Sequence, residues 1–132
     1  MTFDLQIAAR TVYGEARGEP DDGQLAVAHV IVNRLRTNRW GPTLANVCVA
    51  PFQFSSWNNN DPNRPLMMAL MEDDPALTKP LRFLQDALVG APDPTMGACW
   101  YYAVSLVPPP AWDQGQSFIQ IGRHKFFAKD SA

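Results

Sequence analysis

Glu15 is the side chain in this sequence whose surroundings best suit acid–base chemistry. It lies in the run Tyr-Gly-Glu-Ala-Arg-Gly-Glu-Pro at 13–20, near the end of a helix that Gly18 and Pro20 are predicted to terminate. A helix end carries partial negative charge, and burial adds to the cost of ionising a carboxyl group there. A carboxyl group that keeps its proton can act as a general acid. A solvated Glu15 paired with Arg17 or another basic side chain is the alternative, because most glutamates are exposed.

The segment 52–62 mixes aromatic rings with amides and hydroxyl groups and follows neither a helical nor a strand period. Burial would leave many of these polar groups unsatisfied, so we expect the segment at the surface or along a cleft. Aromatic faces separated by amides suit stacking on sugar rings and bonding to acetamido and hydroxyl groups. An ordinary polar loop with two anchoring aromatics is an equally open alternative. The candidate binding residues are Gln53, Phe54, Ser55 and Trp57, with Tyr101 and Tyr102 from an aromatic run near the C-terminus.

A mainly helical framework is predicted to hold these residues. The segment 24–35 is apolar nearly all round and should be the buried central helix, with Asp21 or Asp22 as its N-cap. Shorter helices are predicted at 43–49, capped by Thr43 and ended by Pro51, at 66–71, and from Thr78 as cap to Gly90. The predicted core residues are Leu5, Ala8, Ala9, Val12 and Ala16 in the first helix, the methionines Met67, Met68 and Met71, and Leu81, Phe83, Leu84, Ala87, Leu88 and Val89 in the last.

The C-terminal third favours strands. Segments 99–104 and 118–121 are rich in aromatic and β-branched residues, and a proline-rich connection at 108–112 separates them. We expect a small antiparallel sheet, with 123–127 as its last strand or edge. No internal repeat or second domain is evident, so the sequence predicts a single domain over 1–132.

Composition excludes several classes of protein. Hydrophobic residues make up 46% of the 132 residues and charged residues 18%, which is typical of a globular chain rather than a disordered one. The net charge of −2 argues against nucleic-acid binding. The N-terminus has no basic segment followed by an apolar run, and no stretch suits a transmembrane helix. We therefore expect neither a signal peptide nor membrane insertion.

The cysteines and histidines are expected to be structural. Cys48 and Cys99 lie in apolar or aromatic surroundings and are predicted to be small core residues, with a disulfide between them unsupported. His29, on the apolar central helix, should be a core histidine. His124 is far from it in sequence, so a zinc site is not expected.

Several segments, taken in order, resemble one family. The run at 13–20 is followed by Asp-Gly-Gln-Leu-Ala-Val-Ala at 22–28 and Asn-Arg at 33–34. Gln-Phe-Ser-Ser-Trp stands at 53–57, Asp-Pro-Thr at 93–95, Trp-Tyr-Tyr at 100–102, and Ile-Gly-Arg-His-Lys-Phe at 121–126. Together they resemble the catalytic domain of the spore cortex-lytic type of cell-wall hydrolases, over almost the whole chain.

The resemblance implies a lysozyme-like α+β fold, mainly helical with a small antiparallel sheet towards the C-terminus. It implies cleavage of peptidoglycan glycan strands between N-acetylmuramic acid and N-acetylglucosamine, with Glu15 as the catalytic residue and no cofactor. Family members studied as lytic transglycosylases protonate the glycosidic oxygen with this glutamate, and the muramic acid 6-hydroxyl then closes an anhydro ring. The chain departs from the family at Met96, where many relatives have glycine. The missing secretion signal and wall-binding domain point to a phage-type lysin released by a partner pore protein and acting on the cell wall. We also expect a monomer.

Two alternatives stay open within this prediction. Glycosidases generally use two carboxylates, about 5–5.5 Å apart for retention and about 6.5–9.5 Å apart for inversion. Glu19 lies four residues after Glu15, but Gly18 and Pro20 interrupt the helix that would align the two, so we expect Glu19 to support the local turn. One clear acid favours the transglycosylase over a hydrolytic muramidase. A wall-binding virion module that holds glycan without cutting it is the alternative outside the enzymes.

Overall fold

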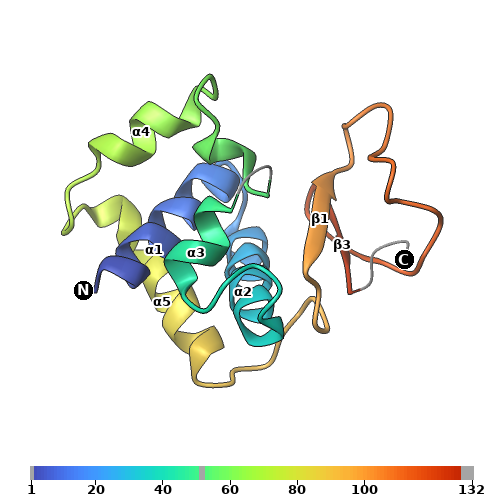
Figure 1. Cartoon of the computed structure of the whole chain (residues 1–132), viewed down its shortest axis with the longest axis horizontal. Helices are drawn as coiled ribbons and strands as arrows, with labels where there is room; N and C mark the ends of the chain where they lie inside the picture. Colours follow the sequence, from blue (N-terminus) through green and yellow to red (C-terminus); the bar gives the residue numbers. More distant parts are fainter. Residues whose placement is uncertain (1, 51–52, 129–132) are drawn as a thin grey trace.

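The computed structural model describes residues 2–50 and 53–128, and it contains a helical part with a small sheet beside it (Figure 1). Pro51 and Phe52, which the sequence placed at a helix end and in the aromatic loop, lie outside the described residues. The helices are α1 (Phe3–Ala16), α2 (Asp21–Thr37), α3 (Leu44–Val49), α4 (Asn63–Ala69) and α5 (Thr78–Leu88), with short 3₁₀ turns η1 (Ser55–Trp57) and η2 (Pro75–Leu77). The strands are β1 (Trp100–Ala103), β2 (Ile119–Ile121) and β3 (His124–Phe127). The predicted α+β class is confirmed.

Helix α2 is the centre of the helical part, as its composition predicts. It contacts α1, α3 and α5, and Val27, Val30, Ile31 and Val32 have no exposed surface. The predicted face of α1 is also correct, since Ala8, Ala9, Val12 and Ala16 are buried against this core. Among the described residues, no helix is both long and apolar enough to cross a membrane.

Three predicted helix ends are wrong in detail. Helix α1 ends at Ala16 with Arg17 still in a helical conformation, and Gly18 does not adopt the left-handed conformation of a glycine cap. Pro20 is the N-cap of α2, so Asp21 and Asp22 lie inside its first turn, where the partial positive charge of the helix end favours carboxylates. Thr78 is likewise the first residue of α5 and not its cap.

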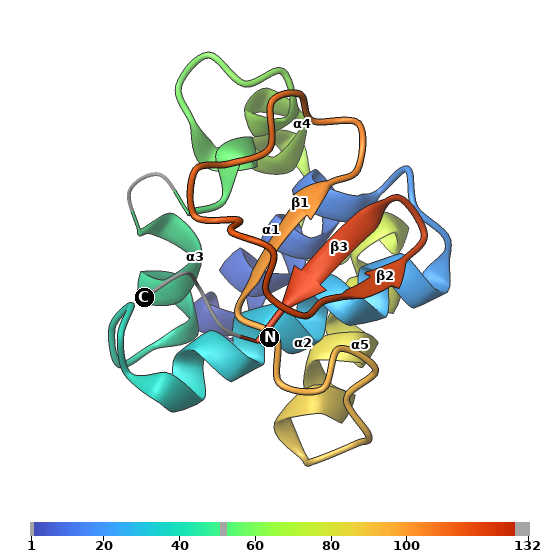
Figure 2. The same cartoon turned by 90° about the vertical axis from the view of Figure 1, so that its right-hand side faces the viewer.

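The sheet has the order β1-β3-β2, and both pairings are antiparallel. Strand β3 is the last strand in the chain, as expected, but it is central in the sheet, so the alternative that it forms the edge is wrong. A tight turn through Gly122, which has a left-handed φ of 57°, joins β2 to β3. The connection 104–118 carries the chain from β1 to the far side of β3. Figure 2 shows the strands lying across α1 and α2.

Some predicted core residues lie at the surface. Met67 is fully buried, but Met68 and Met71 are 59% and 71% exposed, and Leu88 and Val89 at the end of α5 are also exposed. Met67 packs on Gly14 so closely that a Cβ added at Gly14 would lie 2.2 Å from the Met67 sulfur. Gly14 therefore lets α4 approach α1 beside Glu15.

The buried cysteines and the loop before β1 complete the core. Cys48 and Cys99 are buried in the core, as predicted, and both are free thiols; burial raises the pKa of Cys48 to about 12. Burial alone would raise the pKa of Asp93, but hydrogen bonds from Thr95, Asn33 and Gly97 outweigh it and lower that pKa. These bonds tie the loop 93–98 to α2. Within the loop, Met96 has a φ of 54°, which is the left-handed conformation that glycine adopts most easily.

Candidate active site

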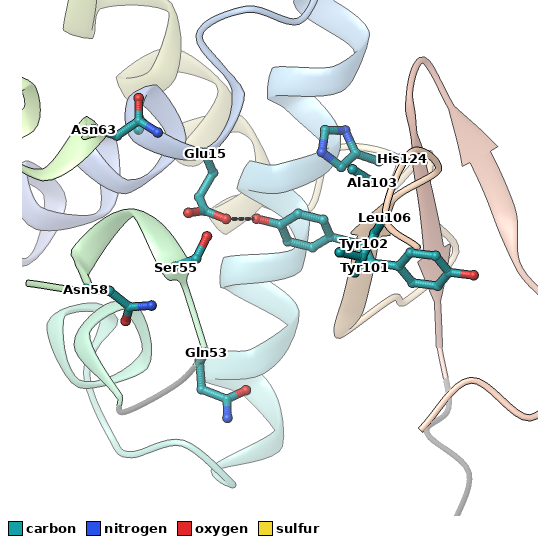
Figure 3. A pocket seen from close by; sticks show the side chains of 11 residues that line it. Glu15, Gln53, Ser55, Asn58, Asn63, Tyr101, Tyr102, Ala103, Leu106 and His124 are labelled. Atoms are coloured by element: carbon teal, nitrogen blue, oxygen red, sulfur yellow. Dashed lines mark hydrogen bonds between the residues drawn. The ribbon is translucent and has the colours of Figure 1, made fainter. Parts of the chain in front are cut away.

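A cavity of about 440 Å³ lies where the end of α1, the segment 53–63 and strand β1 meet. This volume is in the range of small-molecule binding pockets. Figure 3 shows the lining residues, which come from both parts of the fold, with the Tyr101 side chain directed at Glu15. The residues that line it are Gly14 and Glu15 of α1, Gln53, Ser55, Asn58 and Asn63, and Tyr101, Tyr102, Ala103, Leu106 and His124.

Glu15 is half-buried, and both of its carboxylate oxygens are held. The backbone N–H of Ser56 donates to Oε2 at 2.9 Å, and the Tyr101 hydroxyl donates to Oε1. Arg17, the partner that a solvated glutamate would need, instead reaches back to the ring and hydroxyl of Tyr13. Glu15 is therefore fixed at the cavity surface, where a bound molecule could receive a proton from it or return one.

Tyr101 connects the sheet to this carboxylate. Burial, and then the negative charge of Glu15, raise the pKa of its hydroxyl well above the ordinary value. A phenol with a raised pKa stays neutral, so it can donate its hydrogen to Glu15. Its ring stacks on Phe126 with the centroids 5.4 Å apart. Tyr102, the next residue of β1, points the opposite way and donates to Asp113 (Figure 3).

The six expected binding residues divide into two groups. Gln53, Ser55, Tyr101 and Tyr102 line the cavity with Glu15. Phe54 and Trp57 line a neighbouring hollow that also involves Asn58. Phe54 is only 2% exposed, and the Trp57 indole donates to the Thr11 hydroxyl at 2.8 Å. These contacts are those of two aromatic residues that anchor a polar loop, which is the alternative that the sequence left open.

Sequence reasoning did not select Asn58, Asn63 or His124 as cavity residues. Asn58 lies in the polar loop that was singled out, so composition could have found it. Asn63 begins α4 and carries no separate signal. His124 lies in the Ile-Gly-Arg-His-Lys-Phe segment of the resemblance, but only the pairing of β3 with β1 brings it beside Tyr101.

Arg34 of α2 contacts both the residue before β1 and the segment that carries Phe54. Its side chain is almost fully buried, and Nε donates to the Cys99 carbonyl at 2.7 Å. The guanidinium carbon lies 4.7 Å from the ring centres of both Trp40 and Phe54. Burial lowers the pKa of this group, but the aromatic faces are favourable neighbours for a cation. Arg34 thereby positions β1, which begins after Cys99, and the residues flanking Phe54.

Glu19 does not line the cavity with Glu15. Its side chain is only 7% exposed and lies between two residues of the β2–β3 hairpin. Oε1 is 2.9 Å from Nδ1 of His124, and Oε2 is 3.5 Å from Nε of Arg123. Arg123 also donates to the Gly18 carbonyl. The expected support of the local turn is present, and it extends across to the sheet.

A metal site is not apparent in the ranges 2–50 and 53–128, where no group of three or more histidine, cysteine or acidic side chains is suitably placed. His29 is buried in the core, and its Nδ1 lies 3.7 Å from Asp93. The cavity chemistry is therefore that of a carboxyl group, hydroxyls, amides and one imidazole.

Comparisons with known proteins agree with this geometry. The spore cortex-lytic enzymes of Halalkalibacterium halodurans and Bacillus subtilis are 35% and 32% identical to the chain over 124 and 127 residues. These matches cover 93% of the chain but only 34% and 37% of the two relatives, so the chain spans about a third of their length. The crystal structure of the catalytic domain of the Bacillus cereus SleB protein superimposes with a TM-score of 0.74 at 31% identity, covering 93% of this chain and 88% of that one.

The catalytic domain of the germination-specific lytic transglycosylase SleB from Bacillus anthracis gives a TM-score of 0.71, also at 31% identity, with 93% and 92% covered. A family model described as Cell Wall Hydrolase matches residues 18–127. That match begins after Glu15, so the assignment of the acid depends on the cavity geometry and on motif resemblance. The matched range is most of the chain, and the chain therefore belongs to the cell wall hydrolase family.

Proposed function

We propose that the protein cleaves the glycan strands of peptidoglycan between N-acetylmuramic acid and N-acetylglucosamine as a lytic transglycosylase, acting on the cell wall. The observation that carries this proposal is the setting of Glu15. Among the described residues that line the cavity, it is the one carboxylate, and Ser56 and Tyr101 hold both of its oxygens. Similarity to the Bacillus anthracis lytic transglycosylase domain supports the same reaction.

In the proposed reaction, Glu15 protonates the glycosidic oxygen as the bond to the muramic acid C1 breaks. The muramic acid 6-hydroxyl then attacks C1 and closes a 1,6-anhydro ring. Water attack would normally need a second carboxylate, either to activate the water or to form a covalent intermediate. Glu19, the nearest acidic residue in sequence, does not line the cavity and is enclosed by Arg123 and His124 of the hairpin. An internal nucleophile removes the need for that second carboxylate.

The cavity also offers groups that suit the substrate. Gln53, Asn58 and Asn63 carry amides, and Ser55 carries a hydroxyl, on the sides that flank Glu15. Amides and hydroxyls can bond the acetamido and hydroxyl groups of the sugars. Leu106 and the Tyr101 ring add apolar surface. These contacts would hold the scissile bond at Glu15, where a misplacement of about 1 Å can cost on the order of a hundredfold in rate.

Analysis of the reaction products tests the proposal. Purified peptidoglycan is digested in heavy-oxygen water and the muropeptides are weighed by mass spectrometry. We expect 1,6-anhydromuramoyl ends without solvent oxygen, and no inhibition by a chelator. Solvent oxygen in new muramic acid ends would show a muramidase. Sedimentation with peptidoglycan but no loss of turbidity would show a wall-binding module. The Glu15→Gln variant, which keeps the side-chain shape, serves as the inactive control.

A further inference from the structure

His124 is a second proton-transfer candidate in the same cavity. It begins β3, and its ring meets the edge of the Tyr101 ring with the centroids 5.4 Å apart. The Tyr101 hydroxyl in turn donates to Glu15, so the carboxyl group and the imidazole both contact the same tyrosine side chain. Figure 3 shows both beside Tyr101 at the cavity.

The imidazole has a buried carboxylate behind it. Oε1 of Glu19 lies 2.9 Å from Nδ1, although the N–H is not aligned as a hydrogen bond requires, so the contact is electrostatic. Nδ1 is fully buried, while the side chain as a whole is 13% exposed. Nε2, by contrast, is not among the buried nitrogen atoms without a partner, so it is the ring nitrogen that remains for a bound molecule. His124 lines the cavity, which places its imidazole within reach of a bound molecule.

A carboxylate behind an imidazole orients the ring and stabilises the charge that forms when the open nitrogen takes a proton. Glu19 is itself too enclosed to reach a substrate, so any catalytic effect of its charge would act through His124. The charged and titratable groups around the ring are Glu19 from the turn before α2, Arg123 from the hairpin, Tyr101 from β1 and, beyond it, Glu15. Arg123 shares Glu19, but its side chain is 73% exposed and solvent weakens its competing charge.

We propose that His124 is the base of the reaction: Nε2 accepts the proton of the attacking hydroxyl group, and Glu19 is its positioning residue. The inference rests on the proposed function, in which the attacking group is the muramic acid 6-hydroxyl. As the O6–C1 bond forms and the C1–O bond to the leaving sugar breaks, the Glu15 proton goes to the leaving oxygen. The O6 proton goes to His124. Solvent then takes the proton from the imidazolium and returns one to Glu15, which balances the cycle.

A purely structural role is the competing explanation, since Glu19, Arg123 and His124 also join the hairpin to the turn before α2. Two substitutions separate the roles. In His124→Asn the amide reaches the place of Nδ1 and keeps contact with Glu19, whereas in His124→Gln it reaches the place of Nε2. Neither amide can accept a proton. We expect both variants to lose about a hundredfold or more in kcat, as loss of a general base does, with KM and the melting temperature little changed.

Arg123→Gln is the matched control. Arg123 contacts the same carboxylate but does not line the cavity, so we expect kcat to stay near the wild-type value. A base in the reaction makes kcat/KM rise with pH. This rise should be absent in both His124 variants and present in Arg123→Gln. A near wild-type rate in His124→Asn or His124→Gln would overturn the proposal. So would equal losses in Arg123→Gln and His124→Asn, because they would show a structural clamp.

A binding measurement tests the role of His124 in a variant that does not turn over substrate. In the Glu15→Gln variant, the imidazole nitrogens are observed by NMR while a soluble peptidoglycan fragment is added. We expect the His124 Nε2 resonance to shift on binding, and those of buried His29, the other histidine in the sequence, to stay in place. An unchanged Nε2 resonance at saturating fragment would overturn the proposal. Solvent oxygen in the wild-type products would overturn the proposed transglycosylase reaction but not the role of His124. A loss of kcat in the His124 variants would then show that His124 is the base for attack by water.

Discussion

The helical and strand parts of this protein are stabilised in different ways. The helices share one apolar core, in which α2 is surrounded and most of its central side chains have no exposed surface. The sheet is three short strands with aromatic residues on both faces. Tyr101 and Phe126 face the helices, whereas Tyr102 and Phe127 stack on the outer face under Trp112. The connection 104–118 covers this outer cluster.

The boundary between the two parts is polar, and the candidate site lies there. Tyr101 donates to Glu15, Arg34 donates to the Cys99 carbonyl, and Asn33 donates to Asp93 and to the Ala98 carbonyl. The helical part thus supplies the candidate acid and one of the groups that hold it, Ser56, and the sheet supplies the other, Tyr101. A site built this way needs both parts in register, because the Tyr101–Glu15 and His124–Glu19 contacts cross the boundary.

Substitution of the acid should produce the largest effect on activity. We expect Glu15→Gln to lower kcat by about 10²–10⁴-fold or more, because the amide keeps the shape but has no transferable proton. The melting temperature and binding to peptidoglycan should persist. Turbidity loss of purified peptidoglycan measures the rate. Glu19→Gln should lower the rate less, because Glu19 acts only through His124. An inactive Glu19→Gln variant together with an active Glu15→Gln variant would exchange the two roles.

Trp57 tests whether the aromatic loop belongs to the helical core or to the site. Trp57→Ala removes the bond to Thr11 and a half-buried ring, so we expect a loss of about 2–4 kcal/mol in unfolding free energy. Gln53→Ala, in the same loop, should lower turnover with little change in stability. Thermal denaturation and rates are measured on both variants. A stable but inactive Trp57→Ala would instead assign the indole to sugar binding.

Tyr101→Phe tests the contact between sheet and acid. The ring and its packing on Phe126 remain, and only the hydroxyl that donates to Glu15 is lost. We expect kcat to fall about tenfold, with a change of roughly 1 kcal/mol in unfolding free energy. Tyr13→Phe is the control, because that hydroxyl lies on α1 near Arg17 and outside the cavity. Equal rates for Tyr101→Phe and the wild type would show that the sheet does not orient the acid.

The smallest predicted effect is in the loop that leads into the sheet. Met96 is exposed and left-handed, a conformation that costs a non-glycine residue roughly 1–2 kcal/mol. Glycine relieves this strain but has more freedom in the unfolded chain, so Met96→Gly should stabilise the protein by less than about 1 kcal/mol. Gly97→Ala is the matched control and should destabilise the protein, because Gly97 has a φ of 88°, which strains any other residue. No neighbour would touch the added Cβ, so the loss would report backbone strain alone. Chemical denaturation measures both, and a destabilised Met96→Gly would contradict the strain argument.

The amino-acid sequence alone determined most of the elements and the candidate acid. Periodicity identified the apolar face of α1 and the buried α2, because the side chains that must leave water repeat at the helical period. Strand propensity located β1 and β2, and the motif around Glu15 located the acid. The helix caps were less certain, since Pro20 and the residues around it satisfy several capping patterns equally well.

Tertiary structure alone decided which of these residues meet. Strand order depends on where the connection 104–118 leads, and no local pattern specifies that β3 pairs with both other strands. The assignment of Phe54 and Trp57 to anchoring contacts depends on Arg34 and Thr11, residues about 20 and 46 positions earlier in the chain. The same applies to Glu19, whose partner His124 comes from the far end of the chain. Side-chain types and spacing encode what a residue can do, whereas long-range packing determines which neighbours and how much water it has, and these decide its role.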